Sequence, residues 1–349
     1  MSSLLCHTAV FLNFLRLLRR CLAKWFSVGV AFVACFASSA AAPRTPVTAL
    51  AFSPDGSALF VSGYKSVLIQ STKDGTTQRT LNCDLAKITA LTLSPDGRIL
   101  AVSGGTPGES GAAHLFDWKQ RKIMNKLEGD DDLVTSVAFN SDGTQFVVAS
   151  ADATVKIFRI EEGGRETTLA FTLTDHAGPV LAVAFSPDGK TIVTASVDRS
   201  LKVWDASTGK LLRTFSNHTA IVHCVTFRPS GKMPTETIPA FCASGSDDKT
   251  VRVWQPEIGR MVRIVRQHEG AVLALAYSRD GIRLFSAGTE GIVRVIDAEG
   301  DAIRHQWKAH DDWIHSLAMS SEGTKLATGD WAGRVKLWDI SDEIPRLLW

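Results

Sequence analysis

The chain has 349 residues, of which 45% are hydrophobic and 21% are charged, and this composition excludes an intrinsically disordered protein. The net charge is +2, but the first 42 residues hold four cations and no acid. The remaining residues therefore carry 34 basic and 36 acidic side chains, a near balance that argues against nucleic-acid binding.

The first 42 residues have the order of a signal peptide. Four cations at 16–24 precede an apolar run at 25–37 and small residues at 38–42. The run is shorter than the roughly 20 residues that cross a bilayer, so we predict cleavage after Ala40 or Ala41. A membrane anchor through 25–37 and a twin-arginine signal at Arg19 and Arg20 are the alternatives. The sequence predicts an exported protein, periplasmic or extracellular, that contacts a membrane only if this segment is retained.

The rest of the chain repeats one unit seven times. A turn related to Ser-Pro-Asp-Gly recurs at intervals of 41 to 50 residues, with its glycine at Gly56, Gly97, Gly143, Gly189, Gly231, Gly281 and Gly323. This period fits propeller blades of four strands. Apolar residues alternate on both sides of the turns, as in Val180–Phe185 and 191–195, and this pattern predicts antiparallel hairpins. A third strand at 201–204 and a weaker fourth at 211–215 complete the unit.

These repeats resemble the WD40 family. The resemblance rests on the Ser-Pro-Asp-Gly turns and on four dipeptides and four histidines: Trp204-Asp205, Trp338-Asp339, Phe116-Asp117, Ile296-Asp297, His176, His218, His268 and His310. It covers 46–349 and implies an all-β fold, a seven-bladed β-propeller of four-stranded antiparallel blades, as the domain 43–349 that follows the signal at 1–42. Each blade is contiguous in sequence. We therefore expect the ring to close by side-chain packing between the first and last blades, unless 38–46 add a strand.

The resemblance also implies buried tetrads that join a histidine, a hydroxyl, an acid and a tryptophan. Their members would be His176, Ser196, Asp198 and Trp204 in one blade, and His218, Ser246, Asp248 and Trp254 in the next. We predict a structural role for these groups. Three other blades depart from the pattern, with Phe158 in place of tryptophan in the third, Glu290 and Ile296 in the sixth, and Ala332 in place of the acid in the seventh.

The sequence contains no motif for catalysis, zinc or haem. His310, Asp311, Asp312 and His315 are the densest set of metal-ligating types, but we expect loop and blade-entry roles for them. We therefore predict a monomeric, non-catalytic scaffold that binds one or more proteins and uses no cofactor or metal. The alternative is an enzyme or redox accessory that uses the central channel. Cys224 and Cys242 lie on neighbouring strands, as free thiols or as a disulfide.

The binding face is predicted from the family pattern. The loop that enters each inner strand and the turn between the second and third strands open on one narrow face, where partners most often bind. Trp313 and Trp331 fall there in the seventh blade, with His315 nearby, and these three are the candidate partner-binding residues. Packing against the adjacent blade is the alternative for Trp313. An insertion at 104–113 would enlarge the face, and one at 232–239 marks the opposite face as the other possible interface.

Overall fold

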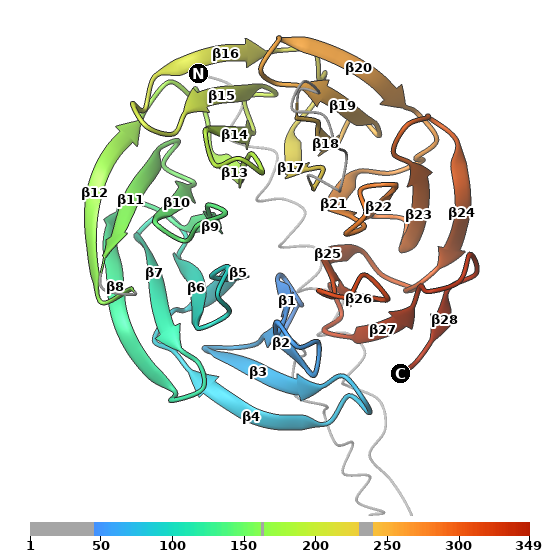
Figure 1. Cartoon of the computed structure of the whole chain (residues 1–349), viewed down its shortest axis with the longest axis horizontal. Coiled ribbons are helices and arrows are strands. Elements are labelled where there is room, and N and C mark those ends of the chain that lie inside the picture. The colour runs from blue at the N-terminus through green and yellow to red at the C-terminus, as the bar shows by residue number, and fades with distance from the viewer. Residues whose placement is uncertain (1–44, 162–163, 230–239) are drawn as a thin grey trace, which may run out of the picture. The chain divides into compact units, whose positions relative to one another are not determined.

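A computed structural model of the chain describes residues 45–161, 164–229 and 240–349. These residues form seven four-stranded antiparallel sheets in a ring around a central channel (Figure 1), so the predicted seven-bladed propeller is confirmed. The described ranges hold no helix of the length and apolar character needed to cross a bilayer. The predicted signal at 1–42 and the insertion at 232–239 lie outside the described residues.

Each blade uses four consecutive strands, and the first of the four lies innermost (Figure 1). The first three blades are β1 (Leu50–Phe52), β2 (Ala58–Ser62), β3 (Ser66–Ser71) and β4 (Thr77–Asn82); β5 (Lys87–Leu93), β6 (Ile99–Thr106), β7 (Ser110–Asp117) and β8 (Lys122–Asp130); and β9 (Val134–Phe139), β10 (Gln145–Ser150), β11 (Val155–Glu161) and β12 (Glu166–Leu173).

The last four blades repeat this order. Their strands are β13 (Val180–Phe185), β14 (Thr191–Ser196), β15 (Leu201–Asp205) and β16 (Leu211–Phe215); β17 (Val222–Phe227), β18 (Cys242–Ser246), β19 (Val251–Gln255) and β20 (Arg260–Val265); β21 (Val272–Tyr277), β22 (Arg283–Gly288), β23 (Ile292–Asp297) and β24 (Ile303–Lys308); and β25 (Ile314–Met319), β26 (Lys325–Asp330), β27 (Val335–Asp339) and β28 (Arg346–Leu347).

The Ser-Pro-Asp-Gly turns join the first and second strands of the blades. In the fourth blade the Ser186 hydroxyl donates to Asp188 Oδ1 at 2.6 Å and accepts from the Thr191 backbone N–H at 2.9 Å. Gly189 takes a left-handed conformation with φ 72°, which glycine adopts without steric cost. The motif therefore recurs because its side chains and its glycine satisfy the backbone of a tight hairpin.

The hydrophobic core lies between neighbouring blades. Trp204 of the fourth blade packs with Val147 and Ile157 of the third, and Trp254 of the fifth packs with Val193 and others of the fourth. Both tryptophans are fully buried. Blade-to-blade packing of this kind lets each repeat bury an apolar face that it could not bury alone.

The described residues close the ring by packing between the first and last blades, and most of the alternative strand at 38–46 lies outside them. The Val47 N–H donates to the Asp330 carbonyl at 3.0 Å, and the Ser316 hydroxyl donates to the Val47 carbonyl at 3.1 Å. The indole of the last residue, Trp349, donates to the Thr72 carbonyl at 3.2 Å. Apolar side chains of the two blades form one shared cluster. All seven sheets consist of four strands consecutive in sequence, so no described strand interlocks the ends.

The two cysteines of the fifth blade are free, and the disulfide alternative is wrong. In the register of β17 and β18, Cys224 lies opposite Gly245, whereas Cys242 lies opposite Phe227. The two side chains are therefore not a cross-strand pair, which a bridge between neighbouring strands would need. Burial raises the pKa of Cys224 to about 12, so this thiol stays protonated at neutral pH.

Candidate functional site: buried tetrads and an exposed aromatic cluster

The fourth blade contains a buried polar chain of four side chains. His176 Nδ1 lies 2.8 Å from Asp198 Oδ2, and its Nε2 lies 2.6 Å from Thr194 Oγ1. The Trp204 indole N–H donates to the same Thr194 oxygen at 3.0 Å. One hydroxyl on the second strand therefore joins the histidine to the tryptophan.

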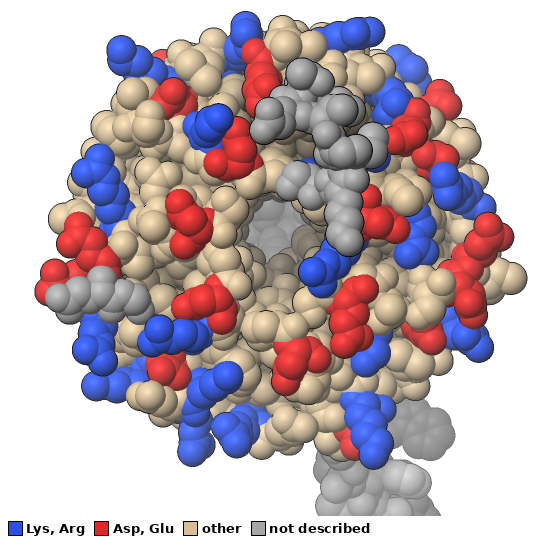
Figure 2. Space-filling model, viewed as in Figure 1, with Lys and Arg blue, Asp and Glu red and all other residues tan. Residues whose placement is uncertain are grey.

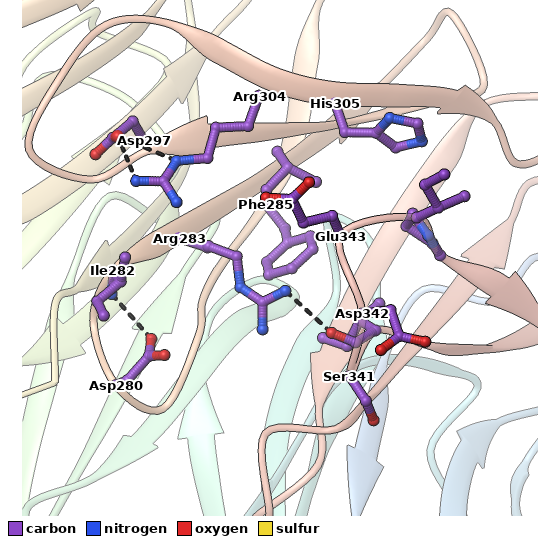
Figure 3. Close-up of a pocket in the computed structure, with 14 residues that line it drawn as sticks. Asp280, Ile282, Arg283, Phe285, Asp297, Arg304, His305, Ser341, Asp342 and Glu343 are labelled. Atoms are coloured by element: carbon purple, nitrogen blue, oxygen red, sulfur yellow. Dashed lines mark hydrogen bonds and ion pairs between the residues drawn. The ribbon is translucent and has the colours of Figure 1, made fainter.

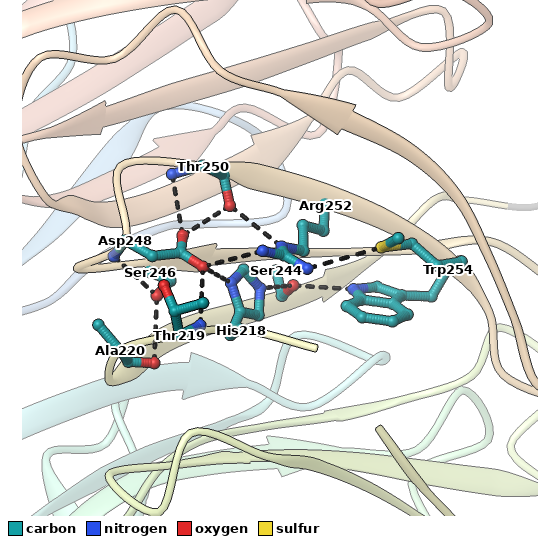
Figure 4. A network of polar contacts seen from close by, with 10 residues as sticks. His218, Thr219, Ala220, Ser244, Ser246, Asp248, Thr250, Arg252 and Trp254 are labelled. Carbon is teal, nitrogen blue, oxygen red and sulfur yellow. Dashed lines mark hydrogen bonds and ion pairs between the residues drawn. The ribbon is translucent and has the colours of Figure 1, made fainter. Parts of the chain in front are cut away.

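The fifth blade builds the same chain (Figure 4). His218 lies 2.7 Å from Asp248 and 2.8 Å from the Ser244 hydroxyl, which also accepts the Trp254 indole N–H at 2.8 Å. Arg252 adds a contact to Asp248 Oδ2 at 3.2 Å. These side chains are buried, as a structural role requires.

The hydroxyl members of both tetrads were assigned wrongly from the sequence. The hydroxyl comes from Thr194 instead of Ser196 in the fourth blade, and from Ser244 instead of Ser246 in the fifth. Residues two apart on a strand share a face, so both serines point the correct way but lie one step too far along. Instead, the Ser196 hydroxyl donates to the Gly178 carbonyl at 3.0 Å and accepts from the Asp198 N–H at 3.1 Å. It fixes the turn that carries the acid.

The seventh blade also has a complete tetrad, which corrects the prediction based on Ala332. His310 lies 2.8 Å from Asp330 and 2.7 Å from the Thr328 hydroxyl, which accepts the Trp338 indole N–H at 3.1 Å. Asp330 is the last residue of β26, so its carboxylate reaches the histidine from the strand rather than from the turn.

The sixth blade keeps part of the network. His268 lies 2.9 Å from the Ser286 hydroxyl and 3.3 Å from Glu290, which makes two contacts with Arg294 at 2.6 and 2.8 Å. Ile296 leaves this network without an indole donor.

The second and third blades hold a different acid–base pair, exposed at Asp84 in the second and largely buried in the third, which the sequence reading missed. An acid precedes the inner strand where other blades have histidine, and its base comes from the third strand. Asp84 lies 3.4 Å from His114, and Asp130 lies 2.8 Å from Lys156. Burial raises the pKa of Asp130 despite the nearby Lys156 ammonium. The available sequence signal was the acid three or four residues before each inner strand.

Burial sets the charge of the tetrad histidines. It lowers the pKa of His176 and of His218, although the neighbouring carboxylates act in the opposite direction, so both rings are neutral at pH 7. Burial would raise the pKa of Asp198, but hydrogen bonds from Ser200 and His176 outweigh it and lower the value to about 2. The His/Ser/Asp composition of a hydrolase triad is therefore present, but inside the blade and with a tryptophan as its last donor.

The structure brings Trp313, His315 and Trp331 together. The centroid of the His315 ring lies 5.0 Å from that of Trp331 and 6.4 Å from that of Trp313, and the two indoles are 6.4 Å apart. Trp313 is 49% exposed and Trp331 is 47% exposed. Their loops are joined because the Trp331 N–H donates to the Trp313 carbonyl at 2.9 Å. We call these three residues the aromatic cluster.

Tyr64 extends this face and was missed. It lies in the turn between β2 and β3, the counterpart in the first blade of the turn that holds Trp331, and it is 69% exposed. The first and seventh blades are neighbours in the ring (Figure 1). Among the exposed large hydrophobic side chains of the described ranges, Tyr64, Trp313 and Trp331 are the aromatic ones. The sequence signal for Tyr64 and Trp331 was an aromatic residue in the turn between the second and third strands. Trp313 lies instead in the loop before an inner strand.

The insertion at 104–113 belongs to the same kind of turn, as predicted. It lengthens β6 and β7 into a hairpin whose tip contacts the third blade, where the Gly108 N–H donates to Asp132 at 2.6 Å.

A family comparison agrees with this geometry. The model of the "WD domain, G-beta repeat" family matches residues 121–159, 167–205, 209–255, 259–297 and 302–339, more than half of the chain. The chain belongs to the WD40 family. The matches fall on the third to seventh blades, and the structure adds the first two.

Several WD40 relatives are similar in sequence. The pre-mRNA-processing factor 19 homolog 2 of Arabidopsis thaliana is 31% identical over 235 residues, which are 67% of this chain and 35% of that protein. The human WD repeat-containing protein 55 is 40% identical over 76 residues, 22% of this chain and 20% of its own. This WD40 chain thus matches only about a third of the plant protein's length.

The WD40 ring has a cleft of about 670 Å³ between its sixth and seventh blades (Figure 3). Arg304 contacts Asp297 at 2.5 Å, and Arg283 donates to the Ile340 carbonyl at 3.0 Å. These cations are already satisfied within the protein. Across the described residues, no group of three or more His, Cys, Asp and Glu side chains is placed to hold a metal ion.

Proposed function

We propose that this WD40 propeller is an exported, non-catalytic scaffold that binds one or more proteins through the face that carries the aromatic cluster. The observation that supports the proposal is the pair of half-exposed tryptophans, Trp313 and Trp331, on neighbouring loops of a rigid blade. Large aromatic side chains supply much of the binding energy at protein interfaces and lose little conformational entropy.

The charge distribution favours a protein partner over a nucleic acid. In the view of Figure 2, which shows one face of the ring, acidic and basic side chains are interspersed and form no continuous basic surface. Nucleic-acid binders need such a surface to neutralise phosphates. The plant relative is named for pre-mRNA processing, but this chain matches 35% of it, and we do not extend that role to the present protein.

Affinity capture with a matched pair of variants tests the scaffold. Trp331→Ala should lose the proteins that the wild-type chain captures from its native compartment, because it removes exposed aromatic area. Leu212→Ala is the control, because Leu212 is 50% exposed on the outer strand β16. Equal capture by Trp331→Ala and the wild type would place the interface elsewhere.

Export is tested separately by amino-terminal sequencing. The cations at 16–24, the apolar run at 25–37 and the small residues at 38–42 support cleavage near Ala41. Recovery of Met1 on the cytoplasmic protein would contradict export, and recovery of Met1 in carbonate-resistant membranes would favour an anchor instead of cleavage.

A further inference from the structure

The fifth and seventh blades use one pair of positions in two ways. His223 and His315 are each the second residue of an inner strand, while Asp247 and Trp331 each follow directly after the second strand. In the fifth blade, His223 Nε2 lies 2.6 Å from Asp247 Oδ1. In the seventh blade an indole replaces that carboxylate, and His315 Nε2 is buried with no hydrogen-bond partner among the described residues.

The three rings of the aromatic cluster are tilted rather than stacked. The planes of Trp313 and Trp331 differ by 47°, and the His315 ring lies at 40° and 39° to them. Both indoles are about half exposed, so their faces are accessible. The face of an indole attracts a cation within about 6 Å of the ring through its quadrupole.

The charge around the cluster is compatible with a bound cation. Burial lowers the pKa of His315, and the nearby His223 and Lys87 add to this, so the ring itself is neutral. Asp311 and Asp312 precede Trp313 in the same loop, and Asp312 accepts the Trp313 N–H at 2.8 Å. Asp311 pairs with Arg334 at 3.3 Å, so Asp312 is the carboxylate that offsets the charge of Lys87.

We propose that Trp313, His315 and Trp331 bind a cationic side chain, arginine or lysine, that the protein partner presents. This proposal rests on the proposed function of the same face. The cation lies against the indole faces. A rotation of the half-exposed Trp331 lets an N–H group of the bound cation donate to His315 Nε2. An apolar side chain would leave that nitrogen unpaired, and an acidic one would be repelled by Asp312.

Short peptides test this site without the native partner. Acetylated and amidated Gly-Arg-Gly and Gly-Lys-Gly are titrated into the full chain, and their neutral counterparts contain citrulline and acetyllysine. Indole N–H signals report binding, assigned to Trp313 and Trp331 by replacing each with phenylalanine. We expect both signals to shift, with about threefold tighter binding of each cationic peptide than of its neutral counterpart. Equal affinity within both pairs would overturn the proposal.

Trp331→Leu is the matched variant. It keeps apolar bulk but removes the indole face, and Val197 shows that the equivalent position of the fourth blade accepts an aliphatic side chain. We expect this variant to stay folded and to lose the preference for the cationic peptides. A retained preference would overturn the role of Trp331. If the peptides show no preference while partner capture still depends on Trp331, the scaffold stands and the cation site is wrong.

Discussion

The fifth and seventh blades have the same buried tetrad but differ at their rim, the face that carries His223 and Asp247 in one blade and His315 and Trp331 in the other. Both bury a His-hydroxyl-acid-Trp tetrad, although the acid is Asp248 in the turn of one and Asp330 at the strand end of the other. At the rim, the partly buried His223 of the fifth blade pairs with Asp247, whereas in the seventh blade Trp331 lies beside His315. The interior tolerates a change in the position of the acid because the same bonds are made. At the rim, the seventh blade has an exposed aromatic surface that the fifth blade lacks.

The largest expected effect separates the tetrad hydroxyl from the serine that was first assigned to it. Thr194→Val keeps the shape but leaves His176 Nε2 and the Trp204 indole N–H without a partner, so we expect the free energy of unfolding to fall by about 2 to 4 kcal/mol. Ser196→Ala should cost about 1 kcal/mol, because it removes bonds that only fix a turn. Chemical denaturation of both variants measures the difference, and equal losses would contradict the corrected tetrad.

Trp204→Phe should have the next largest effect. It keeps most of the apolar bulk but removes the indole donor, so we expect a loss of about 1 to 3 kcal/mol. The same change at Trp338 removes the equivalent bond in the seventh blade and should cost a similar amount. Denaturation midpoints test this, and an unchanged midpoint for both variants would show that the indole bonds do not stabilise the blades.

The sixth blade should make stability depend on pH. Burial and the Arg294 charge lower the pKa of His268 to about 4, although Glu290 opposes them, whereas the unfolded chain binds this proton near pH 6.5. The unfolded state therefore takes up more protons as the pH falls, and the stability present above pH 6.5 is lost between about pH 6.5 and 4. The free energy of unfolding, measured by urea titration at each pH in this range, should fall less steeply with pH in His268→Gln than in the wild type. An equal pH dependence in the two proteins would mean that His268 does not titrate in this way.

The smallest effect is expected at the rim. Trp331 is half exposed, so Trp331→Ala should change the free energy of unfolding by no more than about 0.5 kcal/mol. Thermal unfolding checks this value. A loss as large as that of Trp204→Phe would make Trp331 a core residue and remove the contrast between interior and rim.

The sequence predicted the repeat architecture correctly but not every residue of the tetrads. Seven glycine turns and the alternating runs predicted the blades, because hairpin geometry is local. The tetrad hydroxyl was missed because Thr194 and Ser196 share a face, and only the register decides which one the indole reaches. Asp330 was missed because an acid on the strand can replace one in the turn only if the histidine lies within reach, which is a three-dimensional fact.

The aromatic cluster was predicted in part. Trp313 and Trp331 were placed on one face by their positions in the repeat, and the structure brings their rings together. Tyr64 escaped because its repeat lacks both the histidine and the tryptophan that mark the fourth, fifth and seventh repeats. Its proximity to the seventh blade depends on ring closure, which joins residues more than 250 positions apart.

A crossed comparison of two variants tests the separation of interior and rim most directly. The affinity for a captured partner and the unfolding midpoint are measured for Trp331→Ala and for Ser244→Ala under conditions where both are folded. We predict that Trp331→Ala loses about tenfold or more in affinity at an unchanged midpoint, while Ser244→Ala keeps its affinity and unfolds more easily. Full affinity in Trp331→Ala together with a lowered midpoint would contradict a binding role for the aromatic cluster.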